Sequence, residues 1–144
     1  MTELINSKDI DIKTKIIAKQ IAAEHKGDKT PVVMIGLLKG AFMFYSDLVR
    51  NMDIDVEVDF MREKSYVAKN KQGDIQILKD LETPIKGKHV YIVDDIYDTG
   101  NTMKAVIEYL EVKKPASIKI VSLVTRKSSP KPPVKMFNAF QIDD

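Results

Sequence analysis

His89-Val90-Tyr91-Ile92-Val93-Asp94-Asp95-Ile96-Tyr97-Asp98-Thr99-Gly100-Asn101-Thr102 is the most informative stretch of this sequence. Its apolar run, Val90 to Val93, is typical of a strand buried on both faces of a parallel sheet. Three carboxylates follow, then a Thr-Gly-Asn-Thr loop, in which Gly100 permits a positive φ or a close approach, and then a helical pattern that begins near Met103. A strand, an acidic turn, a loop and a helix in that order predict an anion site, because the N–H groups of the loop and of the helix N-terminus converge.

The carboxylates narrow the chemistry of the ligand. Asp94, Asp95 and Asp98 would repel a phosphate unless each of them faces a different group, such as a sugar diol, a Mg²⁺ ion or a transferable proton. Thr99 and Thr102 add hydroxyl donors beside them. The sequence therefore predicts a phosphorylated sugar with free hydroxyls, accompanied by a metal ion.

The composition is that of an ordinary globular protein with one domain. The 144 residues are 44% hydrophobic and 31% charged, and the net charge of +2 gives no electrostatic reason to expect nucleic acid or a membrane as a partner. The absence of cysteine excludes disulfides, thiolate zinc sites and cysteine nucleophiles, which fits a cytoplasmic protein. We recognise no signal peptide, and no apolar run approaches the ~18 residues of a membrane span.

Periodicity predicts strands that alternate with helices. We expect helices over 8–26, 41–51 and about 103–113, and strands over 31–37, 54–61, 74–78, 90–93 and 117–124. The polar segment 62–73 is predicted to be a flexible loop at the tip of a long β-hairpin. The apolar sides of the helices are expected to carry Ile12, Ile16, Ile17 and Ile21, then Phe42, Tyr45, Leu48 and Val49, and then Met103, Val106, Ile107 and Leu110.

This order of elements predicts an α/β fold with a mostly parallel, twisted sheet flanked by helices, spanning 1–144 as a single domain. In such sheets, ligands bind outside the carboxyl ends of the strands. Three polar segments follow predicted strands, namely Lys39-Gly40, Asp94 to Thr102 and Arg126-Lys127. We therefore expect them to line one crevice.

Several segments together resemble a known family. Val93 to Thr102 is similar to the phosphoribosyl-pyrophosphate signature of type I phosphoribosyltransferases. Leu37 to Phe42, Val58 to Met61 and Lys64 to Tyr66 resemble the hypoxanthine-guanine branch of that family, and Asp74-Ile75 and Lys114-Pro115 agree with it. The resemblance runs from about residue 5 to the C-terminus.

The resemblance implies an activity: purine salvage, in which the 5-phosphoribosyl group of phosphoribosyl pyrophosphate is transferred to N9 of hypoxanthine or guanine, with xanthine as a third candidate base. The products would be IMP or GMP and pyrophosphate, and the cofactor would be Mg²⁺. It also implies a homodimer or a homotetramer in the cytoplasm. A non-catalytic module that senses phosphoribosyl pyrophosphate is the alternative, as is an impaired enzyme.

The resemblance also implies roles for individual residues. Asp98 would be the catalytic acid or base near purine N7, and Asp94 and Asp95 would meet the ribose hydroxyls and the metal. Ser65-Tyr66 resembles the tip of a loop that closes over the reacting centre. Binding of phosphoribosyl pyrophosphate would involve Leu38, Lys39, Gly40, Asp94, Asp95, Asp98, Thr99, Gly100, Asn101 and Thr102, with a Leu38–Lys39 peptide bond that can be cis.

Two departures from the family pattern bear on the purine end. The family places a lysine where this chain has Arg126 followed by Lys127, so either of these residues could read the purine 6-oxo group. The segment 139–144 resembles the part of the family that precedes the aromatic residue stacked on the purine, so we expect the C-terminal hood to be incomplete.

The two aspartates and the two histidines also have simpler interpretations. Asp94 and Asp95 could be solvated turn carboxylates or part of a metal-assisted aspartyl-phosphate site, although the second of these would leave the anion loop unused. His25 and His89 are read as a helix-end and a strand-start residue without chemistry.

Overall fold

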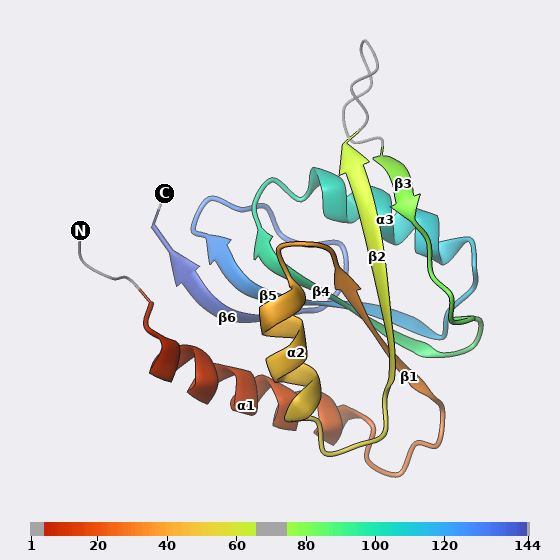
Figure 1. The fold of residues 1–144 in the computed structure, drawn as a ribbon, viewed down its shortest axis with the longest axis horizontal. Helices are drawn as coiled ribbons and strands as arrows, with labels where there is room; N and C mark the ends of the chain where they lie inside the picture. The colour runs from red at the N-terminus through yellow and green to blue at the C-terminus, as the bar shows by residue number, and fades with distance from the viewer. Residues whose placement is uncertain (1–4, 66–74, 144) are drawn as a thin grey trace.

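The computed structural model of the chain describes residues 5–65 and 75–143. Within these ranges there are three helices and six strands (Figure 1). The helices are α1 (Ser7–Glu24), α2 (Phe42–Arg50) and α3 (Asn101–Glu111). The strands are β1 (Val32–Leu37), β2 (Glu57–Ser65), β3 (Ile75–Lys79), β4 (His89–Tyr97), β5 (Ser117–Arg126) and β6 (Met136–Ile142).

The strands form one sheet in the order β3-β2-β1-β4-β5-β6. Every neighbouring pair is parallel except β2 and β3, which are antiparallel. The predicted mostly parallel α/β sheet is thereby confirmed, and so is the pairing of the two strands that flank segment 66–74. Because β1, β4 and β5 run in the same direction, their carboxyl ends lie at one edge of the sheet.

Helices cover both faces of the sheet, with α1 and α2 on one face and α3 on the other (Figure 1). The central strand β4 shows why both faces must be covered: Tyr91 and Val93 pack in the core with α1 and α2, whereas Val90 and Ile92 pack in the core with α3. All four side chains are fully buried. A continuous apolar run thus forms a strand with two buried faces, as predicted.

The predicted apolar sides of the helices agree with the structure in α3 but only in part in α1 and α2. In α3 the four predicted inward residues are all buried. In α1 the buried residues are Thr14, Ile17, Ala18 and Ile21, and in α2 they are Phe44, Tyr45 and Leu48. The prediction was wrong for Ile12, Ile16 and Phe42, which are 46%, 45% and 54% exposed, because the helical rotation carries them past the edge of the contact with the sheet.

Two strands are longer than their apolar patterns. Strand β4 continues to Tyr97, since its pairing with β5 extends to Thr125, so Asp94 and Asp95 lie on the strand and not in a turn. Strand β2 continues to Ser65, which pairs with Ile75 of β3, so the connecting segment begins later than predicted. In both cases backbone pairing with a neighbour extends the strand through polar residues.

Asp59, near the start of β2, is a buried carboxylate with a structural role. It accepts hydrogen bonds from the backbone N–H groups of Phe60, Glu82 and Thr83, at 2.7–2.8 Å. Burial alone would raise the pKa of Asp59, but these bonds and the nearby Lys79 lower it below its ordinary value. Asp59 therefore fixes the segment after β3 against β2.

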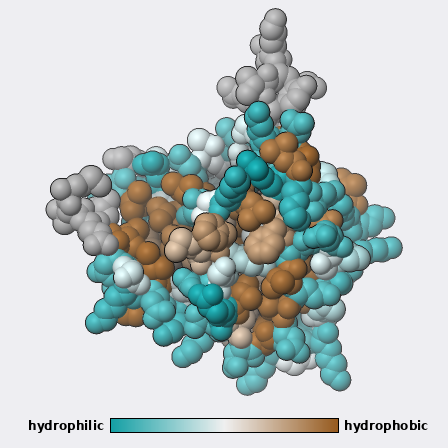
Figure 2. All heavy atoms as spheres, viewed as in Figure 1, coloured by the Kyte–Doolittle hydropathy of each residue, from teal (hydrophilic) through white to brown (hydrophobic). Residues whose placement is uncertain are grey.

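Hydrophobic side chains remain exposed on the face that carries α1 and α2. Figure 2 shows them interspersed with hydrophilic residues on this face. The exposed residues of α1 and α2 include Ile12, Ile16, Phe42 and Met43. No helix of the described residues is both long and apolar enough to cross a membrane.

Candidate active site at the carboxyl edge of the sheet

Asp94 and Asp95 form the acidic part of the site, near the end of β4. Asp94 Oδ1 accepts a hydrogen bond from the Asp95 N–H at 2.9 Å, and Asp95 Oδ1 accepts one from the Ile96 N–H at 2.9 Å. Burial, followed by the hydrogen bond and the negative charge of the neighbouring Asp95 carboxylate, raises the pKa of Asp94. Two carboxyl groups held this close are poised to share a proton or a cation.

The segment after β4 forms an uncapped helix N-terminus. Gly100, the N-cap residue of α3, has φ +82°, and a Cβ there would lie 2.6 Å from the Tyr97 hydroxyl oxygen. Gly100 thus shows both features that the sequence offered as alternatives, a positive φ and a close approach to a neighbour. The N-cap residue makes no side-chain capping bond, and the first turn of α3 carries no acidic residue. Because the first N–H groups of a helix have no partner within the helix, this end can donate to an anion.

A cavity of about 230 Å³ brings these two parts together. Its lining consists of Asp94, Ile96, Tyr97, Asp98, Thr99, Gly100, Thr102 and Met103. Five of the predicted site residues thus border one space, which brings the carboxylates of Asp94 and Asp98 together with the hydroxyls of Thr99 and Thr102. Asn101 opens α3 and directs its backbone N–H to Thr99 Oγ1, at 3.3 Å.

The loop after β1 reaches the acidic pair. The Leu38–Lys39 peptide bond is cis, and the Leu38 N–H donates to the Met61 carbonyl oxygen at 2.9 Å. A Cβ on Gly40 would lie 2.6 Å from Asp95 Oδ2, so the backbone of Gly40 lies directly against this carboxylate. The loop after β1 therefore meets the acidic end of β4 at Asp95. Lys39 is exposed.

The end of β5 brings Arg126 to Asp98. Arg126 Nε lies 3.3 Å from Asp98 Oδ1, and both side chains are about half exposed. Ser129 Oγ accepts from the Arg126 N–H and donates to the Tyr97 carbonyl oxygen, both at 3.0 Å, which ties the ends of β4 and β5 together. Lys127 is exposed, and its backbone N–H donates to the Ile142 carbonyl oxygen.

Strand β2 of the hairpin carries one residue that was predicted to belong to the site and one that was not. Ser65 is the last residue of β2, whereas Tyr66 lies outside the described residues, so the predicted closing loop stays a prediction. Sequence reasoning missed Glu63, whose negative charge contributes to the raised pKa of Asp94 and whose own pKa is raised by burial. Its segment read as a loop, so no sequence signal placed it near Asp94.

Comparison with known proteins gives a consistent result. The family described as phosphoribosyl transferase domain matches residues 3–143. The hypoxanthine-guanine phosphoribosyltransferase of Aquifex aeolicus is 45% identical over 125 residues, which are 86% of this chain and 70% of that protein. The hypoxanthine phosphoribosyltransferase of Escherichia coli K12 is 41% identical over 123 residues, which are 83% of this chain and 69% of that protein.

Solved structures agree with the sequence comparison. A crystal structure of a hypoxanthine phosphoribosyltransferase from Staphylococcus aureus superposes with a TM-score of 0.87 at 32% identity, covering 99% of this chain and 78% of that one. The Trypanosoma cruzi hypoxanthine phosphoribosyltransferase in complex with the product IMP gives a TM-score of 0.86 at 32% identity, covering 95% of this chain and 78% of that one.

Proposed function

The chain belongs to the phosphoribosyl transferase domain family, in its hypoxanthine-guanine branch, and from this premise we propose how its residues carry out the reaction. It is an enzyme of purine salvage, which transfers the 5-phosphoribosyl group of phosphoribosyl pyrophosphate to N9 of hypoxanthine or guanine. The non-catalytic alternative is not favoured, because the matched relatives are named as transferases. The cavity that joins carboxylates to an uncapped helix N-terminus is the observation that carries the residue assignments.

The 5′-phosphate is assigned to the start of α3. The N-cap residue Gly100 has no side chain that could bond the first turn, and the hydroxyls of Thr99 and Thr102 border the same cavity. The helix dipole favours negative charge at this end. Gly100 supplies the backbone conformation that the loop requires, and Asn101 supplies the first helical residue. We assign this loop to the phosphate because donors, dipole and space coincide here.

Asp94 and Asp95 suit the ribose hydroxyls and Mg²⁺. Oxygen donors of this kind are the ligands that Mg²⁺ prefers. Burial, followed by the hydrogen bond and the negative charge of Asp95, raises the pKa of Asp94. The two neighbouring carboxylates are oxygen donors, so the residues present fit a divalent cation. When bound, the ion would neutralise charge on the departing pyrophosphate. The loop of Leu38, Lys39 and Gly40, which lies against Asp95, is assigned to the pyrophosphate.

Asp98 and Arg126 are assigned to the purine. Phosphoribosyl transfer breaks the bond between C1 of ribose and pyrophosphate, forms the bond between C1 and N9, and moves a proton on the base. Asp98 would hold that proton at N7 as general base or acid. The guanidinium of Arg126 borders Asp98 and donates in a plane, so it is our candidate for the purine 6-oxo group. Lys127 is the alternative.

We also propose how the active site is closed, how the chain assembles and in which compartment it occurs. The sugar carries positive charge in the transition state, and a lid formed by Ser65 and Tyr66 would exclude water from it. Exposed Ile12, Ile16, Phe42 and Met43, on the two helices that cover one face of the sheet, support a homodimer or homotetramer, since exposed apolar surface marks contact sites. We also propose a cytoplasmic location, where the substrates of purine salvage occur.

The experiment is direct. Protein, Mg²⁺ and phosphoribosyl pyrophosphate are mixed with hypoxanthine, guanine, xanthine or adenine, and nucleotide and pyrophosphate are quantified by chromatography. We expect IMP and GMP, with pyrophosphate in equal amount, and loss of both products when Mg²⁺ is chelated. AMP as the main product would contradict the assignment to the hypoxanthine-guanine branch. Equal turnover without Mg²⁺ would contradict the metal assignment.

A further inference from the structure

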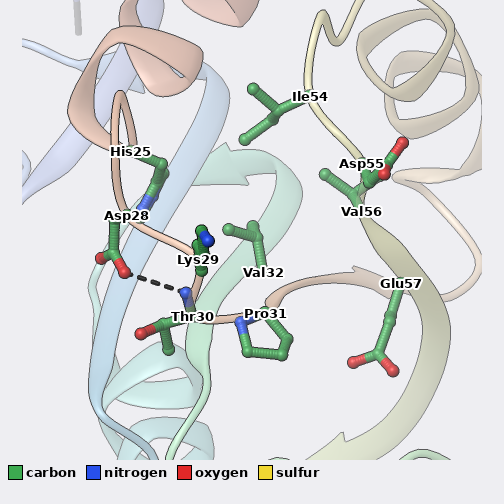
Figure 3. A pocket seen from close by; sticks show the side chains of 10 residues that line it. All are labelled: His25, Asp28, Lys29, Thr30, Pro31, Val32, Ile54, Asp55, Val56 and Glu57. Carbon is green, nitrogen blue, oxygen red and sulfur yellow. Dashed lines mark hydrogen bonds between the residues drawn. The ribbon is translucent and has the colours of Figure 1, made fainter.

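A second cavity lies at the opposite edge of the sheet from the candidate active site. It has a volume of about 500 Å³ and lies where β1 and β2 begin (Figure 3). His25, from the end of α1, and Asp28, from the turn that follows, border it on one side. Asp55 and Glu57 border it on the other side. Phosphoribosyl transfer, as assigned above, makes no use of this cavity.

The only two histidines of the chain meet beside this cavity, although the sequence separates them widely. The ring centroids of His25 and His89 are 4.7 Å apart. One ring nitrogen of each histidine and one carboxylate oxygen of Asp28 all lie within 4.8 Å of one another. Asp28 Oδ2 is 2.9 Å from His89 Nε2. The fold thus gathers three potential metal ligands from α1, the turn and β4.

The hydrogen bonds of His25 leave one of its nitrogens available. The Tyr91 hydroxyl donates to Glu24 Oε1 at 2.7 Å, so its oxygen accepts from His25 Nε2, which lies 2.5 Å away and must carry the proton. His25 Nδ1 therefore presents a lone pair. This atom is buried and has no hydrogen-bond partner among the described residues, and the side chain is only 6% exposed. A buried lone pair without a partner requires an explanation.

The second histidine is oriented in a comparable way. His89 Nδ1 lies 2.7 Å from Ser117 Oγ, and Nε2 faces Asp28. When Nδ1 carries the proton and donates to Ser117, the Nε2 lone pair and the Asp28 carboxylate are two acceptors in contact. Two acceptors in contact repel each other unless a cation lies between them. In the alternative state Nε2 carries the ring proton, and a metal ion would replace that proton on binding. Both imidazoles thus have a second contact that fixes the ring, as metal-binding histidines usually do.

We propose that His25, Asp28 and His89 bind a divalent transition-metal ion of the Zn²⁺ class. Two neutral imidazoles and a carboxylate form a common three-residue zinc set, whereas Mg²⁺ prefers oxygen ligands alone. Ligands at about 2.1 Å from a tetrahedral ion lie about 3.4 Å apart, so on binding the cluster, whose ligand atoms lie within 4.8 Å of one another, closes by up to about 1.4 Å, while the His89–Asp28 pair at 2.9 Å opens slightly. The fourth position, open toward the cavity, would take water or a small anion. The ion would join α1, the turn and β4.

Cobalt is a suitable probe, because tetrahedral Co²⁺ replaces Zn²⁺ and gives intense visible absorption. Tag-free protein is titrated with Co²⁺ in excess Mg²⁺, which occupies the carboxylate site at the opposite edge. We expect one equivalent to bind with a tetrahedral spectrum. Asp28→Asn and His89→Gln should each weaken binding more than tenfold, and Ser117→Ala by about tenfold. Asp55→Asn removes the same charge from the same cavity and should leave the affinity unchanged.

The variants are chosen so that folding can be checked. In the structure Asp28 accepts a hydrogen bond from the Thr30 N–H at 2.9 Å (Figure 3), and Asp28→Asn keeps a side-chain oxygen that can accept it. Circular dichroism checks that each variant is folded. Zn²⁺ should raise the Tm of the unmodified protein and of Asp55→Asn but not that of Asp28→Asn. Equal Co²⁺ affinity in all variants, or an octahedral spectrum that excess Mg²⁺ abolishes, would overturn the proposal.

Discussion

The guanidinium Nε of Arg126 lies 3.3 Å from Asp98 Oδ1. This ion pair joins the end of β5, which carries the cation Arg126, to the segment after β4, which carries the proposed general acid or base Asp98. Both side chains are about half exposed, and an exposed ion pair contributes little to stability. The pairing matters more for position: it holds Arg126 beside the carboxylate that we assign to purine N7. The neighbouring Lys127 has no such contact among the residues that the structure describes.

Arg126→Met and Lys127→Met test which cation reads the base. Each substitution removes one positive charge from adjacent positions, so each is the control for the other. We expect Arg126→Met to raise the KM for hypoxanthine by roughly tenfold to a hundredfold, the effect of a charged hydrogen bond, without changing the affinity for phosphoribosyl pyrophosphate. Lys127→Met should behave like the unmodified enzyme. Steady-state kinetics with the reverse pattern would transfer the role to Lys127.

Asp98→Asn tests the proton carrier. Asparagine keeps the size of the side chain but cannot exchange a proton, so kcat should fall by about 10²- to 10⁴-fold. Binding of phosphoribosyl pyrophosphate, measured by calorimetry, should change little, because the phosphate donors remain in place. An unchanged kcat would remove Asp98 from the mechanism.

Gly40→Ala tests the contact between the loop after β1 and the acidic pair. A Cβ at this position would lie 2.6 Å from Asp95 Oδ2, so the loop or the carboxylate must move. Displacement of about 1 Å in a reacting complex can cost about a hundredfold in rate, and we expect kcat/KM for phosphoribosyl pyrophosphate to fall accordingly.

Gly87→Ala is the matched control for that substitution. Gly87 has φ +72°, and a Cβ there would meet no atom of the described residues within 4 Å, so alanine should cost about 1 kcal/mol of stability through backbone strain while kcat/KM stays unchanged. If Gly40→Ala retained full activity, the loop would not depend on its approach to Asp95.

Asp59→Asn tests the buried carboxylate of β2. Asparagine leaves at least one of the three backbone donors without a partner, at a cost of about 1–3 kcal/mol in the free energy of unfolding. Because the folded-state pKa of Asp59 is lowered, its contribution is present above its ordinary value of about 4 and is lost as the pH falls through the folded value. Urea unfolding between pH 6 and pH 3 should therefore show a shallower decline in the variant.

Asp53→Asn, at an exposed position, should retain the full decline with pH and the full stability. If Asp59→Asn and Asp53→Asn gave the same unfolding curves at every pH, the three hydrogen bonds of Asp59 would have no measurable effect on stability.

The sequence predicted those features that local pattern determines. The apolar run of β4 implied a strand with two buried faces, and the glycine at position 100 implied a positive φ, because few other residues adopt that conformation. The parallel sheet followed from the alternation of strands and helices. That these loops meet at one edge then followed from the direction of the strands.

Features that depend on distant partners were missed. Asp94 and Asp95 read as turn residues because the pairing that keeps them in β4 comes from β5. Glu63 read as a loop residue because its partner strand, β3, follows an intervening segment. His25 and His89 were given no chemistry, since only the packing of α1 against the start of β4 brings them together. Such juxtapositions are products of tertiary structure.

The most direct test of the central claim is a two-dimensional amide NMR titration of the protein with phosphoribosyl pyrophosphate and Mg²⁺. If the carboxylates and the N–H donors bind the same activated ribose, the amide signals of Thr99 to Thr102 and of Lys39 and Gly40 should shift together and saturate at a single affinity. The amides around His25 and Asp28, at the opposite edge, should stay unchanged. Shifts confined to that opposite edge, or two groups saturating at different affinities, would contradict a single shared site.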